Sequence, residues 1–547
     1  MSTAPDRAQD RAQGRAQGRM LPSLLADRAQ RTGGDVCVIE AETGASLTYR
    51  ELHQEAEALA AGLAALGVEA GDTVATMLPH SADTYRIWFA LSHLGALEVP
   101  IGTKYRGRML VHILEDSAAR AIVIDAGFVG ELGQVLDDHD LPRLETVVVR
   151  GGDGPTASPE RVATVRLDDL RDGWGGRGAE ALVRRDPRPR DLALVLYTSG
   201  TTGASKGVLV PWGQVDATVT GVFPEGTCVP GKVLYGPFPP NHIGGRLFVG
   251  MGIRYGLPAV IRDTFSASAY WSDVGAHGCT TTALVSAMVA ILSSAPQQAT
   301  DSRNTLCDVL MNPLTADYEE FQSRFGVRVC TDFNMTETSI PLHSGWTIED
   351  WRSCGRVRPG PPGYELRLVD EHDNPVAPGE VGELVCRTSD PWTLNAGYLG
   401  RPVETAAAWR NGWFHTGDAF RVDEEGRYYF VDRMKDAIRR RGENVSSFEV
   451  EREVLDHPDV LDCAAIGVPS ELGEEDIKVF VVLRPGAALS ARALIDHVRA
   501  RSAPFMVPRY VEFLEELPRT EATQKVKKAE LRARDARSAG PTPMESR

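Results

Sequence analysis

The residues best suited to chemistry lie between Tyr197 and Gly207, in the order Tyr-Thr-Ser-Gly-Thr-Thr-Gly-Ala-Ser-Lys-Gly. Three glycines let the backbone turn its N–H groups inward, five Ser and Thr hydroxyls add donors, and Lys206 supplies a cation. The order is not G-x-x-x-x-G-K-[ST], because a glycine follows the lysine where that motif has a hydroxyl for magnesium. A flexible surface loop is the alternative, but the strand expected before this stretch and its Lys-Gly ending favour a polyphosphate-binding loop.

Two further stretches carry candidate groups. In Thr331–Thr338 a strand end is followed by hydroxyls and the carboxylate of Glu337. Beside a phosphate loop this carboxylate would be a magnesium ligand, because Mg²⁺ prefers few carboxylates together with phosphate oxygens. His242 lies in the turn-rich stretch Gly236–Gly245, where a lone histidine is more often structural than catalytic.

Strands and helices that alternate along the chain must position these residues. The apolar run 192–196 predicts a buried strand that ends where the phosphate loop begins. Thr48 can cap a helix that carries Leu52, Leu59 and Leu63. The other expected elements of this half are strands over 73–78, 121–125 and 146–149 and a helix over 84–94. Such βα alternation predicts an α/β fold with a parallel sheet covered by helices.

The pattern changes twice towards the C-terminus. Short alternating strands separated by Pro/Gly turns predict a compact β subdomain between Gly363 and Arg387. The charged run 432–436 follows a hydrophobic strand and is the expected domain boundary. A smaller α+β domain follows, with a strand over 479–483 and a basic helix around 525–537.

Composition limits the class of protein. A chain of 547 residues exceeds what one core usually serves, so at least two domains are expected. A net charge of −16 argues against a nucleic-acid partner. No apolar run approaches the ~18 residues of a membrane span, no signal peptide is recognised, and the eight scattered cysteines are expected to be reduced. These features predict a cytoplasmic protein. Residues 1–19, a repetitive Arg-rich segment, are expected to be a disordered extension.

Taken in this order, the segments resemble the adenylate-forming superfamily of acyl-CoA synthetases, firefly-type luciferases and peptide-synthetase adenylation domains. The resemblance covers nearly the whole chain, from about Met20 to Arg534. Residues 197–207 match its phosphate loop, Phe333–Glu337 its adenine and magnesium motif, and Thr416-Gly417-Asp418 its ribose motif. Leu517–Val526 is similar to the loop that carries the adenylation lysine.

The resemblance implies a site for each part of ATP and for a magnesium ion. Candidate catalytic residues are Lys525, Glu337, Thr336 and His242. Candidate nucleotide- and CoA-binding residues are Thr198, Ser199, Gly200, Thr201, Thr202, Lys206, Phe333, Asn334, Asp418, Arg433, Lys435 and Gly442. Glu337 and Thr201 are the candidate metal ligands. Asp418 suits a ribose because a carboxylate can accept both hydroxyl protons.

The implied activity has two half reactions. Lys525 and Mg²⁺ would stabilise the charge that develops while a carboxylic acid attacks ATP, giving an acyl adenylate and pyrophosphate. Coenzyme A would then take the acyl group after the C-terminal domain turns about a hinge at Lys435 and brings the Gly442 loop to the site. Arg439, Arg440 and Arg441 could hold CoA phosphates, or could equally form a solvated charge run.

The implied architecture has an N-terminal domain over residues 20–432, with parallel-rich α/β sheets and a β subdomain, and a small mobile α+β domain over 433–547. Three departures from the family pattern stand out. Gln524 replaces a glycine, Leu310–Leu314 replaces a Gly-rich segment, and Ser447 replaces a proline found in many relatives. The tract 334–339 is similar to carnitine-CoA-ligase-like enzymes and to ligases of secondary metabolism.

Several alternatives stay open from the sequence. A freestanding ligase could load a carrier protein instead of CoA, and a luciferase-like oxidoreductase would share the ATP residues. An amino-acid adenylation domain is disfavoured because His242 cannot supply the negative charge that pairs with an ammonium group. A non-catalytic nucleotide-binding module is disfavoured because it would need neither Lys435 nor Lys525. The acid itself is left open, with a bulky or polar acid as plausible as a fatty acid and Gly244 and Gly245 expected to leave room for it. A homodimer is left open.

Overall fold

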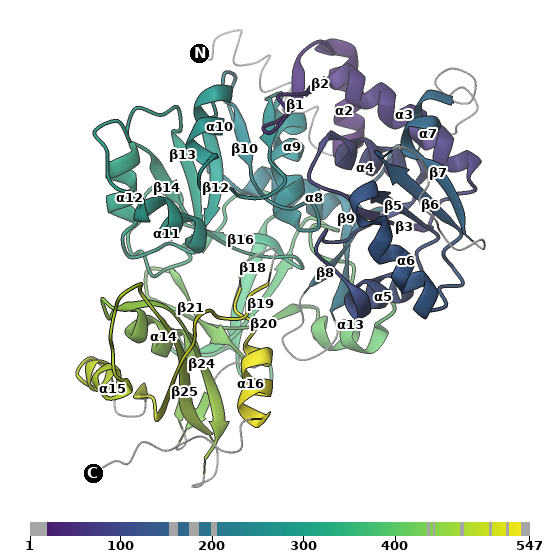
Figure 1. Ribbon diagram of the computed structural model, residues 1–547. Helices are drawn as coiled ribbons and strands as arrows, with labels where there is room; N and C mark the ends of the chain where they lie inside the picture. Colours follow the sequence, from purple (N-terminus) through teal and green to yellow (C-terminus); the bar gives the residue numbers. More distant parts are fainter. Residues whose placement is uncertain are drawn as a thin grey trace. The chain divides into compact units, whose positions relative to one another are not determined.

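The chain forms two compact units. The computed structural model describes residues 19–152, 162–173, 185–198, 205–434, 438–440, 443–470, 475–502, 506–520 and 525–537. The first unit contains the described residues up to Thr198, together with Ser205–Glu365 and Arg387–Gly412. The second contains Leu366–Cys386 and the described residues from Trp413 onward. Each unit has its own sheets and core (Figure 1).

Two seven-stranded sheets form the centre of the first unit. The first sheet has the strand order β14-β13-β12-β10-β11-β1-β2 and the second β7-β6-β5-β3-β4-β8-β9. Neighbours run parallel except for β1·β2 and β8·β9, which are antiparallel edge pairs. This confirms the expected α/β class with parallel-rich sheets. The unit holds two such sheets, and local periodicity did not reveal how many there would be.

The strands of the first sheet are β1 (Val36–Glu40), β2 (Ser46–Thr48), β10 (Leu234–Gly236), β11 (Ala259–Ile261), β12 (Thr281–Val285), β13 (Asp308–Asn312) and β14 (Arg328–Cys330). Those of the second sheet are β3 (Thr73–Met77), β4 (Leu97–Pro100), β5 (Ala121–Asp125), β6 (Thr146–Arg150), β7 (Ala163–Arg166), β8 (Leu192–Thr198) and β9 (Lys206–Pro211). A third, small sheet is made of β15 (Asp332–Met335), β16 (Ser339–His343) and β17 (Arg356–Val357).

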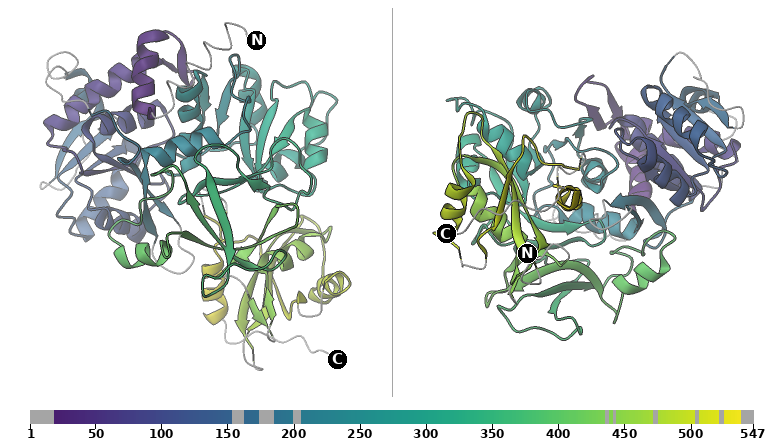
Figure 2. Two further views of the ribbon diagram at one scale, coloured as in Figure 1. Left: turned by 180° about the vertical axis from the view of Figure 1, so that it is seen from behind. Right: turned by 60° about the horizontal axis from the view of Figure 1, so that its bottom comes forward.

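The described part of this unit has twelve α-helices, and most of them cover the faces of the two large sheets (Figures 1 and 2). They are α2 (Leu21–Arg31), α3 (Tyr49–Ala65), α4 (Ala82–Leu94), α5 (Gly107–Asp116), α6 (Val129–Asp138), α7 (Leu167–Gly173), α8 (Trp212–Gly221), α9 (Ile243–Tyr255), α10 (Tyr270–His277), α11 (Ser286–Ser294), α12 (Tyr318–Phe325) and α13 (Pro402–Ala408). A short 3-10 helix spans Ala126–Phe128.

The main core lies between the two large sheets. It is built from buried side chains of α2, α3, α4, α8 and α9 and of strands from both sheets. At its centre the indole rings of Trp88 and Trp212 stack with their centroids 5.0 Å apart. A second core lies under α5 and α6, and a third lies under α10, α11 and α12. The two sheets are therefore joined by one continuous apolar layer, and this layer fixes the loops that leave their strands.

Local signals in the sequence account for several element boundaries. Thr48 forms a capping box with Glu51 at the start of α3, as its position predicted. Gly95 ends α4 in the left-handed conformation (φ 75°), which a residue with a Cβ rarely adopts. The helix itself begins at Ala82, two residues before the expected Thr84. The strands expected over 73–78, 121–125, 146–149 and 192–196 are present as β3, β5, β6 and β8.

The second unit is rich in β structure and closes with a helix. Its strands are β18 (Tyr364–Val369), β19 (Gly382–Thr388), β20 (Phe414–Val422), β21 (Tyr428–Arg433), β22 (Ile438–Arg440), β23 (Glu443–Val445), β24 (Val460–Pro469), β25 (Glu475–Leu483) and β26 (Tyr510–Phe513). Its helices are α14 (Ser447–Leu455), α15 (Ala491–Arg499) and α16 (Lys528–Arg537). The expected β subdomain is the four-stranded sheet β18-β19-β20-β21.

That four-stranded sheet groups mostly with the C-terminal unit, although β18 and β19 straddle the division between the units. The sequence had assigned it to the N-terminal domain. The expected boundary at 432/433 and the hinge at Lys435 stay predictions, because Lys435 lies outside the described residues. All eight cysteines carry thiols. Among the described helices none combines the length and apolar character needed to cross a bilayer.

Candidate active site

Strands β8 and β9 of the first unit flank the segment that the sequence predicts to be a phosphate loop. Strand β8 pairs antiparallel with β9, and the register places Thr198 opposite Lys206. Helix α5 holds this hairpin at two points: His112 Nε2 is 2.8 Å from the carbonyl oxygen of Ser205, and Tyr197 donates its hydroxyl to Asp116 at 2.9 Å. Burial and the Asp116 hydrogen bond raise the pKa of Tyr197, so the hydroxyl keeps the proton that it donates. Ser199, Gly200, Thr201 and Thr202 lie outside the described residues.

Tyr398 connects the loop lysine with the expected magnesium ligand. The Lys206 ammonium lies 5.3 Å from the centroid of the Tyr398 ring, in a cation–π arrangement. The hydroxyl of the same tyrosine donates to Glu337 Oε1 at 3.3 Å. Two groups that the sequence proposed for phosphate and metal are thus held by one side chain. Tyr398 was not predictable from the sequence, because nothing in its local sequence marks it and it lies 61 residues from Glu337.

The backbone around Glu337 is fixed by neighbouring elements. Asn395 donates to the carbonyl oxygen of Glu337 through both its backbone N–H and its side-chain amide, each at 3.0 Å. Gln214 of α8 donates its amide to the carbonyl oxygen of Thr336 at 2.6 Å. Residues 396–399 in turn hydrogen-bond to β9, so backbone hydrogen bonds connect the segments that carry Lys206, Tyr398 and Glu337. Glu337 itself is 8% exposed.

The expected adenine motif begins on β15, next to an unexpected buried carboxylate. Phe333 is half-buried and Asn334 is exposed. Asn334 donates its amide to Asp332 Oδ1 at 2.8 Å, and Asn312 of β13 donates to the same oxygen. Among the described residues Asp332 Oδ2 has no hydrogen-bond partner. Burial raises the pKa of Asp332 to about 7 although the two amides lower it. Asn312 belongs to the segment that departs from the Gly-rich family pattern, and this contact gives it a structural role.

Asp332 makes stability depend on pH in a defined window. The pKa of an aspartate is ordinarily 3.8 and that of Asp332 is about 7 in the fold, so the folded state keeps a proton that the unfolded chain releases. Stability should therefore fall as pH rises from about 4 to about 7 and then level off. Asp332→Asn should remove this loss and be more stable than wild type at pH 8 by about 1–3 kcal/mol. Urea midpoints at pH 5 and pH 8 measure it; a gap between the two proteins that does not widen with pH would contradict it.

His242 lies at the N-terminus of α9. Its Nδ1 accepts a hydrogen bond from the backbone N–H of Gly244 at 3.4 Å, and so it caps the helix. This placement gives the residue a structural role, and its catalytic role stays a prediction. Gly245, in the first turn of the same helix, leaves no room for a substrate group, because a Cβ there would lie 2.2 Å from the carbonyl oxygen of Pro239. The expectation that Gly245 makes space for bulk is therefore wrong.

The ribose motif lies in the second unit, on β20 and β21. Asp418 is opposite Arg433 in the strand register, and Arg433 Nε lies 3.2 Å from Asp418 Oδ1. Asp418 is 1% exposed. The N–H of the preceding residue, Gly417, donates to Glu383 Oε1 at 2.9 Å, and this fixes the turn in front of the carboxylate. The structure thus pairs two residues that the resemblance assigned to one ribose.

Lys525 is exposed in the second unit, next to Val526, which pairs with Arg519 in an isolated antiparallel β-bridge. The Lys525 N–H donates to Thr520 Oγ1 at 3.1 Å, and Thr520 N–H donates to the Lys525 carbonyl oxygen at 2.8 Å.

Ser447, which stands where many relatives have proline, donates both its N–H and its hydroxyl to Asp432 Oδ2, at 2.5 and 2.6 Å. Proline could donate neither bond, so serine is explained here. Gly442 lies outside the described residues.

Arg440 does not present a cation to solvent. Its side chain is buried, its Nε lies 3.3 Å from Asp476 Oδ1, and its NH1 donates to the carbonyl oxygen of Val507 at 2.6 Å. The structure therefore assigns Arg440 to an ion pair inside the second unit, which argues against its proposed role in holding CoA phosphates.

Comparison with known proteins identifies the family of this chain. Residues 25–399 match the model of the AMP-binding enzyme family, and residues 449–523 match the AMP-binding enzyme C-terminal domain. The chain is 31% identical to a crotonobetaine/carnitine–CoA ligase of Salmonella arizonae over 492 residues, which cover 88% of this chain and 92% of that protein. A ligase of the same name from Escherichia coli is 31% identical over 481 residues, covering 86% of this chain and 90% of its own.

Solved structures share the fold over nearly the whole chain. An o-succinylbenzoate CoA synthetase from Bacillus subtilis, solved with its acyl-adenylate intermediate, is 25% identical with a TM-score of 0.79 and covers 95% of this chain and 99% of its own. An anthranilate CoA ligase with bound anthranoyl-AMP has a TM-score of 0.81 at 24% identity, with 95% and 98% covered, and shows the fold alone. Because the family model matches more than half of its length, the chain belongs to the AMP-binding enzyme family, as an AMP-forming acid–thiol ligase of the acyl-CoA synthetase type.

Proposed function

We propose that this protein activates a small polar carboxylic acid with ATP and Mg²⁺ and transfers the acyl group to coenzyme A. The proposal rests on the contacts among Lys206, Tyr398 and Glu337. The ring of Tyr398 contacts the Lys206 ammonium and its hydroxyl donates to the Glu337 carboxylate, so a cation and a carboxylate lie close together at the end of the expected phosphate loop. A polyphosphate that carries a magnesium ion needs both charges close together.

The residues present fit a magnesium ion. Glu337 offers one carboxylate, and Mg²⁺ bound with nucleotides takes one or two carboxylates and fills its remaining positions with phosphate oxygens and water. When bound, the ion would neutralise charge on the phosphate oxygens. Thr201 stays a proposed second ligand. Asn395 and Gln214 hold the backbone of residues 336–337, so the carboxylate is positioned before nucleotide binds.

In the first half reaction Lys206 would bind the phosphates that leave as pyrophosphate. Thr198, Ser199, Gly200 and Thr202 would add loop donors. Phe333 and Asn334 would border the adenine, and Asp418 with Arg433 would hold the ribose hydroxyls. Lys525 would approach the carboxylate oxygens that attack the α-phosphate, where its ammonium stabilises developing charge. In the second half reaction Lys435 would serve as hinge and the Gly442 loop would replace Lys525. Thr336 and His242 complete the proposed set.

The proposal of a small polar acid rests on two observations. The relatives at 31% identity are ligases whose names specify crotonobetaine and carnitine, and the match spans about nine-tenths of their length. In this chain the segment after β10 packs closely against helix α9. The ring of Phe238 stacks on that of Phe248 with centroids 6.3 Å apart, and Gly245 contacts Pro239. A segment packed in this way favours a short acyl group over a long one.

A panel of acids tests the function. Purified protein with ATP, Mg²⁺ and CoA is offered a betaine-type acid, a hydroxy acid, an aromatic acid and a long-chain fatty acid, with pyrophosphate and thioester read by mass spectrometry. We expect a short polar acid to give both products, with kcat/KM at least about 10-fold above the fatty acid. Pyrophosphate without CoA thioester would instead favour a carrier protein as acceptor, and dependence on O₂ would favour an oxidoreductase. A preference for the long chain would contradict the acid class.

Tyr398→Phe should separate the two contacts of the tyrosine. The variant keeps the ring beside Lys206 but loses the hydroxyl that donates to Glu337. A hydrogen bond to a charged group contributes about 1.5–3 kcal/mol, so the apparent affinity for Mg²⁺ in adenylate formation should weaken about 10- to 100-fold. Tyr429→Phe, whose hydroxyl donates to Asp423 in the second unit, is the matched control. An unchanged Mg²⁺ dependence in Tyr398→Phe would remove Tyr398 from the site.

A further inference from the structure

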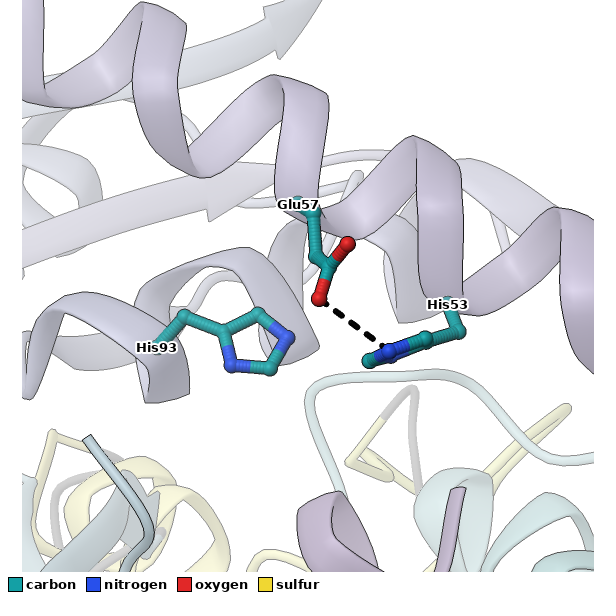
Figure 3. Close-up of side chains that lie close together, drawn as sticks. All are labelled: His53, Glu57 and His93. Carbon is teal, nitrogen blue, oxygen red and sulfur yellow. Dashed lines mark ion pairs between the residues drawn. The ribbon is translucent and has the colours of Figure 1, made fainter. Parts of the chain in front are cut away.

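Two neighbouring helices of the first unit bring two histidines and a glutamate together. His53 and Glu57 lie one turn apart on α3, and His93 lies in the last turn of α4 (Figure 3). One possible ligand atom from each side chain lies within 4.8 Å of the other two. None of the three belongs to the proposed ATP site. We propose that His53, Glu57 and His93 bind one divalent transition-metal ion of the zinc class, which joins α3 to α4.

The distances are close to those of a tetrahedral site. With Zn–N and Zn–O bonds of about 2.0–2.1 Å, neighbouring ligand atoms lie about 3.4 Å apart and two imidazole centroids about 5 Å apart. His53 Nε2 lies 3.1 Å from Glu57 Oε1, and the centroids of the His53 and His93 rings are 5.9 Å apart at an interplanar angle of 66°. Side-chain rotations that bring the ring centroids closer by less than about 1 Å, and the most distant pair of ligand atoms closer by up to about 1.4 Å, would complete the geometry.

The surroundings keep the three side chains in place. The His53 and Glu57 side chains are 15% and 13% exposed, and His93 is 6% exposed. On α3 the buried residues Leu52, Ala56 and Leu59 alternate with this pair, so the backbone that carries it is packed into the core. In the described part of the chain, the buried Nδ1 of His53 has no hydrogen-bond partner. No hydrogen bond at Nδ1 therefore holds the ring in another orientation, and Nε2, which lies beside Glu57, is the nitrogen placed to bind the ion.

The donor set indicates the kind of ion. Two imidazoles and one carboxylate suit zinc and its transition-metal neighbours, whereas Mg²⁺ and Ca²⁺ prefer oxygen ligands alone. Three protein ligands leave one tetrahedral position for water. Without a metal, a protonated His53 would form an ordinary ion pair with Glu57, one turn along the same helix. That contact does not involve His93, so the effect of changing His93 distinguishes the two arrangements.

Metal titration of the full chain tests the site. Tag-free protein is treated with EDTA, freed of chelator, and titrated with Zn²⁺ and, separately, with Co²⁺. Excess Mg²⁺ is present so that Glu337 does not contribute to the number of Zn²⁺ or Co²⁺ ions bound. We expect one equivalent of Zn²⁺ to bind, and Co²⁺ to give the intense visible absorption of a tetrahedral site. His53→Gln and His93→Gln should each weaken binding at least about 10-fold. His372→Gln, whose ring is 75% exposed, is the matched control and should bind as wild type does.

Thermal unfolding gives a second readout that does not depend on catalysis. Zn²⁺ should raise the unfolding temperature of the wild type and of His372→Gln, and leave that of His53→Gln and His93→Gln unchanged, because only a bound ion stabilises the fold. Circular dichroism and acyl-adenylate formation in the three variants show that each is folded. The proposal is supported if the wild type binds one equivalent of Zn²⁺ and this binding is lost when either His53 or His93 is replaced. Absence of a stoichiometric equivalent, or equal affinity in all variants, would overturn it.

Discussion

Replacing Lys525 by alanine is expected to lower the rate of acyl-adenylate formation by about 10²–10³-fold, the usual cost of removing one group that stabilises developing charge. Thioester formation from a supplied acyl adenylate should stay close to the wild-type rate, because that step does not require this ammonium in the proposed mechanism. Lys525 is exposed, and its backbone hydrogen bonds to Thr520 do not involve the side chain. The variant should therefore fold normally.

The two half reactions are measured separately. Pyrophosphate release reports the first, and conversion of a synthetic acyl adenylate with CoA reports the second. Lys527→Ala is the matched control, because this lysine lies two residues further along and pairs with Glu530 at 3.0 Å. It should leave both rates unchanged. If Lys525→Ala slows both half reactions equally, the proposed division of labour between Lys525 and the rest of the site is wrong.

Glu98→Gln is expected to destabilise the first unit by about 3–5 kcal/mol, because it leaves a buried arginine without a counter-charge. Glu98 of β4 is 0% exposed and lies 2.7 Å from Arg246 of α9, whose side chain is 1% exposed. Thr76 donates to the same Glu98 oxygen at 2.6 Å. The Arg246 guanidinium lies over the rings of Tyr85 and Trp88. Helix α9 packs against β10 and β11 of the first sheet, whereas β4 belongs to the second sheet. The pair therefore joins the two large sheets across the main core.

Urea unfolding followed by tryptophan fluorescence measures the loss. Glu365→Gln is the matched control: Glu365 pairs with Arg387 at 2.6 Å, but the two side chains are 50% and 43% exposed. Exposed pairs contribute at most about 1 kcal/mol, so this midpoint should hardly move. Glu98→Gln combined with Arg246→Met should recover part of the stability, since the second change removes the buried charge that the first one leaves uncompensated. Equal effects of Glu98→Gln and Glu365→Gln would contradict the buried pair's role.

Much of the fold followed from short-range signals. The capping box at Thr48 and the glycine after α4 mark helix ends, because these contacts form within one turn of the chain. The apolar run 192–196 gave β8, because a strand buried on both faces needs continuous hydrophobic residues. The number of sheets and the order of their strands were not predictable in this way. Neighbours such as β4 and β8 are far apart in sequence, and periodicity does not encode which strands meet.

In the candidate site, too, some features follow from the sequence and others only from the tertiary structure. The sequence by itself determined the types of chemical group available: the loop lysine, the Glu337 carboxylate, the Asp418 and Arg433 pair, and Lys525. Tertiary structure decided which groups share a partner, because Tyr398, which contacts Lys206 and Glu337, lies 61 residues from Glu337 in the sequence. The buried pair of Arg246 and Glu98, outside the candidate site, likewise joins residues 148 positions apart. Tertiary structure also gathered His53, Glu57 and His93 from two helices and buried Asp332, whose pKa depends on that burial. Charge and hydrogen-bonding capacity belong to the residue, whereas solvation and distance to a partner arise only when distant segments pack together.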